Sequence, residues 1–180
     1  MKIKGISADD IKKLRELTSC GVIDCKNALE EALGDITKAK EILIKKRGAE
    51  IAAKKSGRAA KEGRVDSYVH MGNKIAVLVE VNSETDFVAR NEDFCKFTKD
   101  VAMHIAAKSP RYIRKEDVPA DILKAQVDQK MFIKENCLLE QAFVRDESLT
   151  IQDYLNSLVA KMGENIFISR FARYKVGENE

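Results

Sequence analysis

Apolar residues in the first part of the chain recur three and four positions apart, which is the spacing of one face of an α-helix. Ser7 can cap a first helix, in which this face is formed by Ile11, Leu14 and Leu17. A turn from Thr18 to Ile23, around Gly21, leads to a second helix that Asp24 can cap and Gly34 can end. The apolar face of this second helix consists of Ala28, Leu29 and Leu33.

A third helix is predicted to start at Asp35 and to end at a basic stretch and Gly48. Its apolar positions are Ile36, Ala39, Ile42 and Leu43. Three helices in so short a segment predict a small bundle that folds as a satellite of a second domain. The segment that follows is rich in alanine and lysine and shows little to bury. We therefore predict a three-helix module over 1–48, a basic connector over 49–63 and a core domain over 64–180.

The hydrophobic period changes from helical to alternating after Gly63. The first alternating set is Val65, Ser67 and Val69. After "MGNK", which offers a tight turn, the second set is Ile75, Val77, Val79 and Val81. Alternation on both sides of a tight turn predicts a β-hairpin with one buried face. A third strand is predicted near the end of the chain, in "NIFISRFARYKV".

Helical patterns lie between the hairpin and the last strand. Asn91 can cap a helix with the apolar positions Phe94, Phe97, Val101 and Ile105, and Pro110 and Pro119 break the pattern after it. A further helix is predicted from about Ala120 into the 130s, with the apolar set Ile122, Leu123, Val127, Met131 and Phe132.

A last helix is predicted where Thr150 and Asp153 form a capping box, and Gly163 ends it. Together these elements predict an α+β protein. Its N-terminal three-helix module precedes a core domain that has a small antiparallel sheet with helices packed on one face.

Composition agrees with a folded, helix-rich chain. Of 180 residues, 44% are hydrophobic and 34% charged, and only two are proline, which argues against disorder. The N-terminal segment lacks the apolar region of a secretory signal, and no apolar run is long enough to span a bilayer. We therefore expect a cytoplasmic protein with no membrane contact.

The sequence contains no recognisable catalytic or metal-binding motif. Its four cysteines show no C-x-x-C spacing, and only His70 and His104 could complete a metal site, so we expect reduced thiols, no metal and no cofactor. Both histidines fit structural or surface roles better than catalysis. P-loop, dinucleotide-binding and hydrolase motifs are absent from the sequence. This absence favours a binding protein over an enzyme.

Apolar side chains occur at two places where the local pattern predicts exposure. Val22 and Ile23 fall in the turn between two helices, and Phe87 follows the second strand beside Asp86. Either place could bind a partner. Alternatively, Val22 or Ile23 packs on the following helix as a hydrophobic staple, and Phe87 starts the core of the next helix. The spacing alone does not decide between these interpretations.

The same residues carry a resemblance to a known family. "LRELTSCGVIDCKNAL", Leu14 to Leu29, resembles the N-terminal signature of bacterial elongation factor Ts. "EVNSETDFVAR", Glu80 to Arg90, resembles its second signature throughout, and "KMGENI", Lys161 to Ile166, is similar to a third recurrent segment. The three-helix module resembles ubiquitin-associated domains. The chain departs from the family at Ser19, where glycine is usual, and at Val22 and Ile23, where methionines are usual.

The resemblance implies a translation factor that binds the GTPase elongation factor Tu and speeds its release of GDP without a covalent step. It implies that Thr85, Asp86, Phe87 and Val88 disturb the Mg²⁺ site of the partner. Asp86 and Phe87 would be the wedge itself, while Thr85 can cap a helix and Val88 can pack inward. A second contact is implied for the N-terminal module, through Arg15, Val22, Ile23, Asp24 and Lys26.

The chain also resembles the short form of the family, which has one core module and no coiled-coil insertion. This form implies a homodimer through the core sheet, and no cysteine in "NIFISRFARYKV" would link it covalently. Two other functions stay open. One is a protein-binding module without exchange activity. The other is an RNA- or ribosome-binding protein that uses the basic residues between Lys45 and Arg64, although no aromatic residue is interleaved for stacking and no direct nucleic-acid contact is expected.

Overall fold

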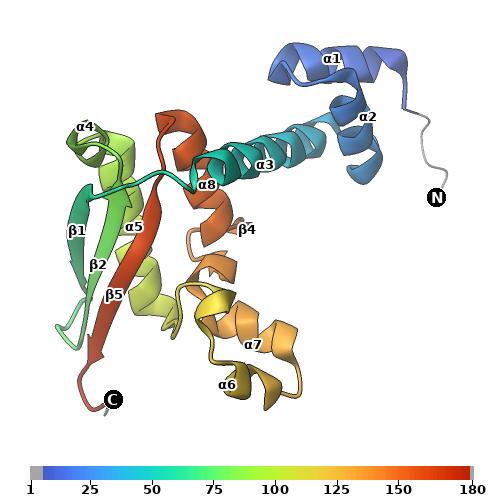
Figure 1. The fold of residues 1–180 in the computed structure, drawn as a ribbon. Coiled ribbons are helices and arrows are strands. Elements are labelled where there is room, and N and C mark those ends of the chain that lie inside the picture. The colour runs from blue at the N-terminus through green and yellow to red at the C-terminus, as the bar shows by residue number, and fades with distance from the viewer. Residues whose placement is uncertain (1–5, 179–180) are drawn as a thin grey trace.

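The computed structural model describes residues 6–178 and shows an α+β protein, as the sequence predicts (Figure 1). Three helices form its N-terminal part: α1 (Ala8–Thr18), α2 (Val22–Glu31) and α3 (Ile36–Lys55). Helix α3 is the longest of the three and runs from this end of the molecule toward the sheet, where it meets α8 (Ile151–Met162) (Figure 1).

Short-range capping starts the N-terminal helices. Ser7 and Asp10 form a capping box on α1, and the Asp35 carboxylate accepts hydrogen bonds from the backbone amides of Thr37 and Lys38 at the start of α3. Side chains from all three helices then form a core of their own, consisting of Leu14, Cys25, Ala28, Leu29, Ala32, Ala39 and Leu43. Leu17 and Leu33 were predicted to join this core, but both are exposed, and Leu33 has a left-handed backbone conformation after α2.

Two predicted boundaries in this region are wrong. Helix α2 begins at Val22 with Gly21 as its cap, so Asp24 lies inside the first turn, where its charge favours the helix N-terminus. Helix α3 does not end near Gly48 but continues to Lys55. Gly48 is buried, and a Cβ on it would touch the Asn156 backbone at 3.4 Å. The glycine therefore allows α3 and α8 to pack closely rather than ending a helix.

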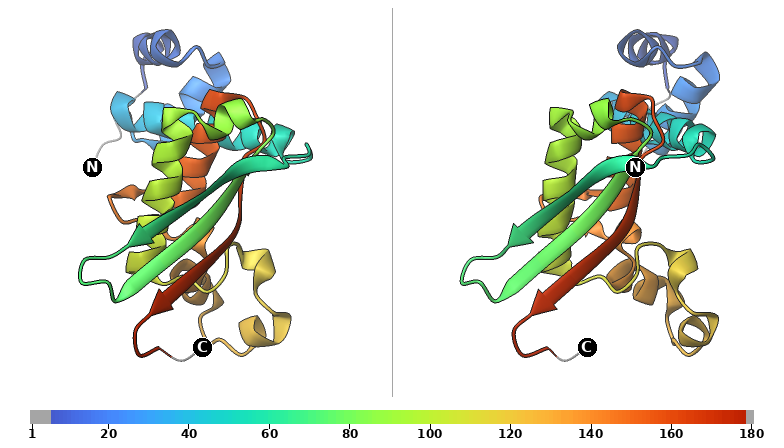
Figure 2. Two further views of the ribbon diagram at one scale, coloured as in Figure 1. Left: turned by 90° about the vertical axis from the view of Figure 1, so that its left-hand side faces the viewer. Right: turned by 60° about the vertical axis from the view of Figure 1, so that its left-hand side comes forward.

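The predicted hairpin and last strand form one antiparallel sheet. It consists of β1 (Glu62–Val69), β2 (Ile75–Ser83) and β5 (Phe167–Lys175), in the order β1-β2-β5 (Figure 2). The central strand β2 buries Val77, Val79 and Val81. Val65 and Val69 lie on the opposite, exposed face, and Tyr68 is the side chain of β1 that packs against the core.

Helices cover one face of this sheet (Figure 2). They are the short α4 (Asp86–Ala89), α5 (Glu92–Lys108), capped by the Asn91 side chain, and α8, which has the predicted Thr150–Asp153 capping box and ends at Gly163. Their apolar faces and β2 share one large core. Its largest fully buried members include Phe94, Phe97, Ile105, Leu138, Ile151 and Ile168.

The single helix predicted from about Ala120 into the 130s is wrong. Two short helices, α6 (Ala120–Lys124) and α7 (Gln129–Asn136), replace it because the Asp128 carboxylate accepts a hydrogen bond from the Met131 amide and starts a new helix. Val127 is fully exposed between them. The remaining elements are η1 (Lys115–Asp117), η2 (Leu138–Glu140), β3 (Ala142–Phe143) and β4 (Asp146–Thr150).

Candidate functional site

Phe87 occupies the junction between the buried strand β2 and helix α5, in the four-residue helix α4. Its side chain is 81% exposed. The next two residues turn inward, since Val88 packs against the large core and Ala89 is buried. The interpretation in which Phe87 starts the core of α5 is therefore wrong. An aromatic side chain stands in water at the end of a fixed strand.

Thr85 fixes the start of α4. Its hydroxyl donates a hydrogen bond to Oε1 of Glu164 at 2.6 Å and accepts one from the Val88 amide at 3.4 Å. Its backbone amide donates to the other carboxylate oxygen of Glu164 at 3.0 Å. One carboxylate from the turn between α8 and β5 thus holds both the cap residue and its backbone. Hydrogen bonds to a charged acceptor are the stronger kind.

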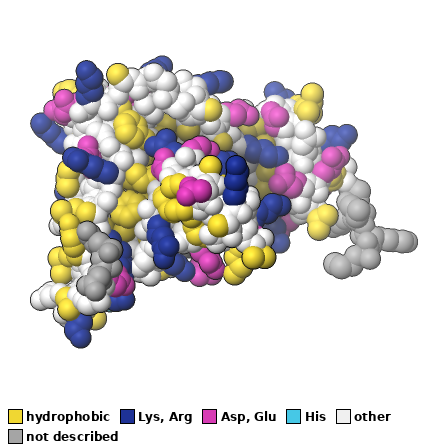
Figure 3. All heavy atoms as spheres, turned by 60° about the horizontal axis from the view of Figure 1, so that its bottom comes forward, with side chains coloured by type: hydrophobic (Ala, Val, Ile, Leu, Met, Phe, Trp, Pro, Cys, Tyr) yellow, Lys and Arg dark blue, Asp and Glu magenta, His cyan; other side chains and the backbone are white. Residues whose placement is uncertain are grey.

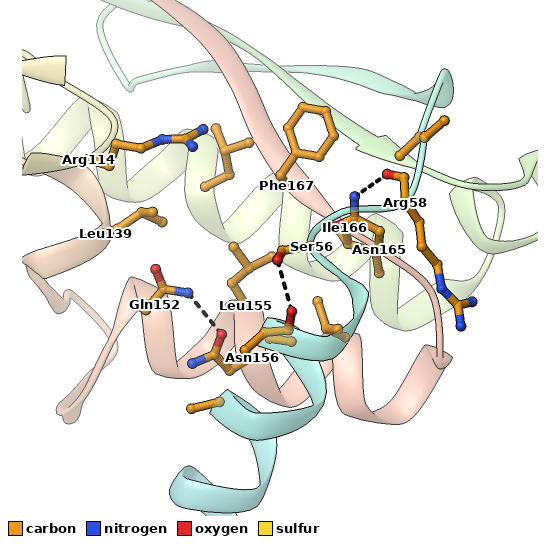
Figure 4. A pocket seen from close by; sticks show the side chains of 17 residues that line it. Ser56, Arg58, Arg114, Leu139, Gln152, Leu155, Asn156, Asn165, Ile166 and Phe167 are labelled. Carbon is orange, nitrogen blue, oxygen red and sulfur yellow. Dashed lines mark hydrogen bonds between the residues drawn. The ribbon is translucent and has the colours of Figure 1, made fainter. Parts of the chain in front are cut away.

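Asn165, the residue after Glu164, makes a second connection between the α8–β5 turn and the segment before α4. The Asn165 amide donates to Oε1 of Glu84 at 2.6 Å, and the Arg58 guanidinium lies 3.6 Å from Oε2 of the same carboxylate. The Asn165 side chain in turn donates to the Arg58 carbonyl at 2.7 Å, as Figure 4 shows. The segment before Phe87 is therefore tied to both the α8–β5 turn and the chain after α3, which limits the motion of the exposed ring.

Asp86 lies beside Phe87 and forms an ion pair with Arg90 at 2.9 Å. Both side chains are largely exposed, and such a pair contributes only about 0–1 kcal/mol. Asp86 can therefore exchange Arg90 for another cation or hydrogen-bond donor at little cost. Phe87 and Asp86 together offer an apolar and an acidic contact on one short helix.

The candidate residues of the N-terminal module lie on α1 and α2. They are Arg15, Val22, Ile23, Asp24 and Lys26, and all five are exposed. Because Ile23 is 74% exposed in the first turn of α2, it does not pack as a staple. Beside this surface, Asp24, Ser19 and Arg47 line a hollow of about 280 Å³.

The structure does not bring these two groups together. The N-terminal module and α4 lie toward opposite ends of the molecule, with α3 between them (Figure 1). A helix of 20 residues is about 30 Å long. A partner that touches both groups at once must therefore be at least as large as a small protein domain.

Neither histidine belongs to these surfaces. His104 is buried; its Nδ1 accepts a hydrogen bond from the Val144 amide, and its Nε2 donates to Gln141. Burial lowers its pKa, which keeps the ring neutral and structural. Over residues 6–178, no cluster of three or more His, Cys, Asp or Glu side chains could hold a metal ion, and no helix is long and apolar enough to cross a bilayer. All four cysteines are free.

A cavity of about 680 Å³ lies where α3, α8 and the start of β5 meet (Figure 4). Ala49, Ala52 and Ala53 of α3 line one side, and Leu155 and Val159 of α8 line another. Arg58 and Asn165, which hold Glu84, also border it. The cavity therefore adjoins the support of α4, but not Phe87 itself.

Sequence reasoning missed the residues that position the site. Glu164, Asn165 and Arg58 are remote in the chain from α4; Glu164 is 79 positions from Thr85. The available signal was the recurrent segment Lys161 to Ile166, which contains the first two. No local pattern shows that this turn contacts the end of β2.

The fold and the exposed ring define the class of protein: an α+β core with a helical N-terminal module that holds an aromatic side chain in solvent. The family model for elongation factor Ts matches residues 7–129 and 127–178. The elongation factor Ts of Caldanaerobacter subterraneus is 50% identical to this chain, over 96% of this chain and 98% of its own. Those of Anaeromyxobacter sp. strain K and Fervidobacterium nodosum are 53% and 50% identical, over 96% of this chain and 89% and 99% of theirs.

The chain therefore belongs to the elongation factor Ts family and is a translation elongation factor. The resemblance found in the three signature segments is confirmed at the level of the family.

Proposed function

We propose that the protein binds elongation factor Tu with GDP bound and promotes release of the nucleotide. The observation that carries this proposal is the exposure of Phe87 on a helix fixed by Glu164 and Asn165. A rigid apolar ring loses little conformational entropy on binding, so its burial in a partner becomes usable binding energy.

The proposed mechanism is mechanical and electrostatic rather than covalent. A GTPase holds its nucleotide through phosphate contacts and a bridging Mg²⁺. Phe87 enters between elements of the GTPase beside this site and Asp86 accompanies it, so the complex favours the conformation in which the Mg²⁺ and phosphate contacts are broken. By linkage, the factor weakens GDP binding by the same ratio as GDP weakens binding of the factor.

The N-terminal module supplies the second contact in this proposal. Val22 and Ile23 are exposed at the start of α2, beside the charged residues Asp24 and Lys26. Helix α3 separates this surface from Phe87, so the two contacts lie on different sides of one partner domain. The N-terminal module would thus hold the partner at a fixed distance from Phe87.

The substitution Phe87→Ala tests the proposal. Truncation of a buried aromatic anchor costs about 2 kcal/mol or more, and about 1.4 kcal/mol is a factor of ten. We expect Phe87→Ala to reduce stimulated release of labelled GDP from elongation factor Tu more than about tenfold while its circular dichroism and thermal unfolding stay those of the parent.

Val127→Ala is the matched control, because Val127 is a fully exposed apolar residue in the turn between α6 and α7. This variant should exchange GDP like the parent. Near-normal exchange by Phe87→Ala would contradict the wedge. Retention of most of the affinity by residues 1–55 alone would instead favour a binding module without exchange activity.

The basic stretch offers less support for RNA binding. Several of its side chains already make contacts within the chain. Four form ion pairs: Lys45 with Asp153, Lys46 with Glu31, Arg58 with Glu84 and Arg64 with Asp66. Arg47 donates a hydrogen bond to the Thr18 carbonyl. These basic side chains therefore help to hold the fold together. We expect the affinity for the partner to depend on Phe87 more than on these residues.

We further infer that a second copy of the chain covers the outer face of the sheet. Val65, Leu78 and Tyr174 are each more than half exposed there. Adjacent exposed apolar residues on one flat face favour an interface. The face also holds Glu80 and Arg170, paired at 2.7 Å, which a two-fold related copy can pair reciprocally.

A further inference from the structure

A second cavity, of about 590 Å³, lies at the hairpin end of the sheet, away from α4. Ile75, Met103, Ala106 and Val144 supply apolar walls. The charged side chains among its described lining residues are basic: Arg145, Arg173 and Lys175, with His70 beside them. Figure 3 views the molecule from this end and shows apolar and basic side chains next to one another over the end of the sheet.

Arg173 is the unusual member of this set. It pairs with Val77 across the sheet and lies on the face that the helices cover, with only 12% of its side chain exposed. One guanidinium nitrogen donates weakly to the Ala106 carbonyl at 3.5 Å, and Nε has no hydrogen-bond partner among the described residues. A guanidinium that is largely removed from water requires an anion and further acceptors.

Glu178 supplies that anion from the end of the chain. One of its carboxylate oxygens accepts from Nη1 of Arg173 at 2.7 Å, and the other accepts from Nζ of Lys175 at 2.6 Å. The Glu178 side chain is half exposed, so a ligand from solvent can reach this position, whereas the Arg173 side chain is largely buried. The carboxylate therefore marks where an anion binds and is itself replaceable by a stronger one.

The cavity is too large for an isolated anion. Its volume falls in the range of pockets for small organic ligands. Tyr68 and His70 form a pair of rings at its border, with centroids 6.1 Å apart and a hydrogen bond between them. Aromatic faces of this kind stack on nucleobases of any sequence.

We propose that this cavity binds a nucleoside monophosphate. The phosphate displaces Glu178 and binds Arg173 and Lys175, because a phosphate offers more charge and more acceptor oxygens than a carboxylate. The nucleoside lies on the apolar walls beside Tyr68 and His70. This function is separate from the contact with a GTPase, since the cavity and Phe87 lie at different ends of the sheet.

Isothermal titration of the purified full chain with adenosine 5′-monophosphate and guanosine 5′-monophosphate tests the proposal. We expect saturable binding that Arg173→Met weakens at least tenfold, because the variant keeps the apolar stem and loses the charge. Lys124→Met is the matched control: Lys124 is an exposed basic residue on α6, outside the lining of the cavity, and its loss should leave binding unchanged. No GTPase is present, so the result is independent of exchange activity.

Removal of the Glu178 carboxylate should change the affinity for the nucleotide in the opposite direction. Glu178→Gln should tighten nucleotide binding at least threefold, because the resident carboxylate no longer competes with the phosphate for Arg173 and Lys175. If Arg173→Met does not fold, Lys175→Met replaces it and should weaken binding about threefold. Adenosine and inorganic phosphate should each bind at least tenfold more weakly than the nucleotide.

Several results would overturn the proposal. They are absence of binding by the parent chain, equal effects of the Lys124 and Arg173 variants, and unchanged or weaker binding by Glu178→Gln. A 5′-phosphorylated RNA trinucleotide that binds more than tenfold better than the mononucleotides would also overturn it, in favour of an RNA site.

Discussion

Ser19 has a backbone conformation that favours glycine. It ends α1 in the left-handed conformation, with φ 55°, and its amide donates to the Arg15 carbonyl at 2.7 Å. Glycine, which the resemblance gives as usual there, adopts this conformation without steric cost. The serine therefore adopts this conformation at an energetic cost.

We expect Ser19→Gly to stabilise the protein by roughly 0.5–1 kcal/mol, because relief of about 1–2 kcal/mol of left-handed strain outweighs the extra entropy of glycine in the unfolded chain. Equilibrium unfolding in urea measures the change. Ser56→Gly is the control, since Ser56 ends α3 at φ −56°, where glycine relieves no strain and should destabilise. A destabilising effect of both substitutions would contradict the explanation.

Phe87 and the N-terminal candidates were found in the sequence because they are apolar residues at places where the local pattern predicts exposure. Phe87 follows the end of a buried alternating strand, and Val22 and Ile23 fall in a predicted turn between two helices. The structure confirms the exposure of Phe87, Val22 and Ile23. Their roles in partner binding stay predictions.

At the scale of elements, α4 depends on a partner segment rather than on its own length. Four residues cannot form a stable helix alone, so its position comes from the Glu164 carboxylate and from Val88 and Ala89 in the core. The α8–β5 turn thereby controls the direction of Phe87.

We expect Glu164→Gln to lower stimulated GDP release about fivefold to tenfold while Phe87 itself is unchanged. Thr85 presents two donors to this side chain, and glutamine offers only one acceptor oxygen, so one donor exchanges its acceptor for water at a cost of about 0.5–1.5 kcal/mol. Hydrogen exchange at residues 84–89 should rise in the variant. Glu140→Gln, an exposed acid on η2, makes the same charge change and should have no effect.

An unchanged exchange rate in Glu164→Gln, together with faster hydrogen exchange at α4, would show that the helix need not be rigid for activity. That result would remove the link between the α8–β5 turn and function but would leave Phe87 as the wedge.

Local signals predicted most element starts and failed where distant contacts decide. The caps at Ser7, Asp35, Asn91 and Thr150 lie within three residues of the groups they bond, so the sequence contains the whole interaction. Gly48 was predicted to end α3 because glycine often ends a helix. In the structure the helix continues, and the glycine is needed for close packing against Asn156. Glu164 and Arg58 reach the candidate site only through the tertiary fold, and no local pattern contains that information.

At the scale of the whole molecule, we propose the division into a module over 1–48, a connector over 49–63 and a core domain over 64–180. Two separate apolar clusters support it, one in the first three helices and one around β2. The connector has a more structural role than its composition suggests, since residues 49–55 continue α3 and Ile51 and Ala52 pack against the larger core. Helix α3 thus belongs to both parts and fixes the distance between the two proposed contacts.

The proposed dimer follows from the outer face of the same sheet. Leu78 lies in the central strand opposite Ala172, with Val65 and Glu80 beside it around a shallow hollow. A two-fold copy would bury Leu78 against its equivalent. Leu78 is 51% exposed, so its burial would contribute about half of the roughly 1.5–3 kcal/mol for a whole leucine side chain, and each of the two copies would make this contribution.

We expect sedimentation velocity to show a dimer of the parent chain at micromolar concentration and a monomer for Leu78→Asp, because the substitution places two like charges at the centre of the interface. Met71→Asp is the control, since Met71 is exposed in the β1–β2 turn and outside this face. Reducing agent should not change the dimer, because β5 contains no cysteine. A monomeric parent would contradict the proposed interface.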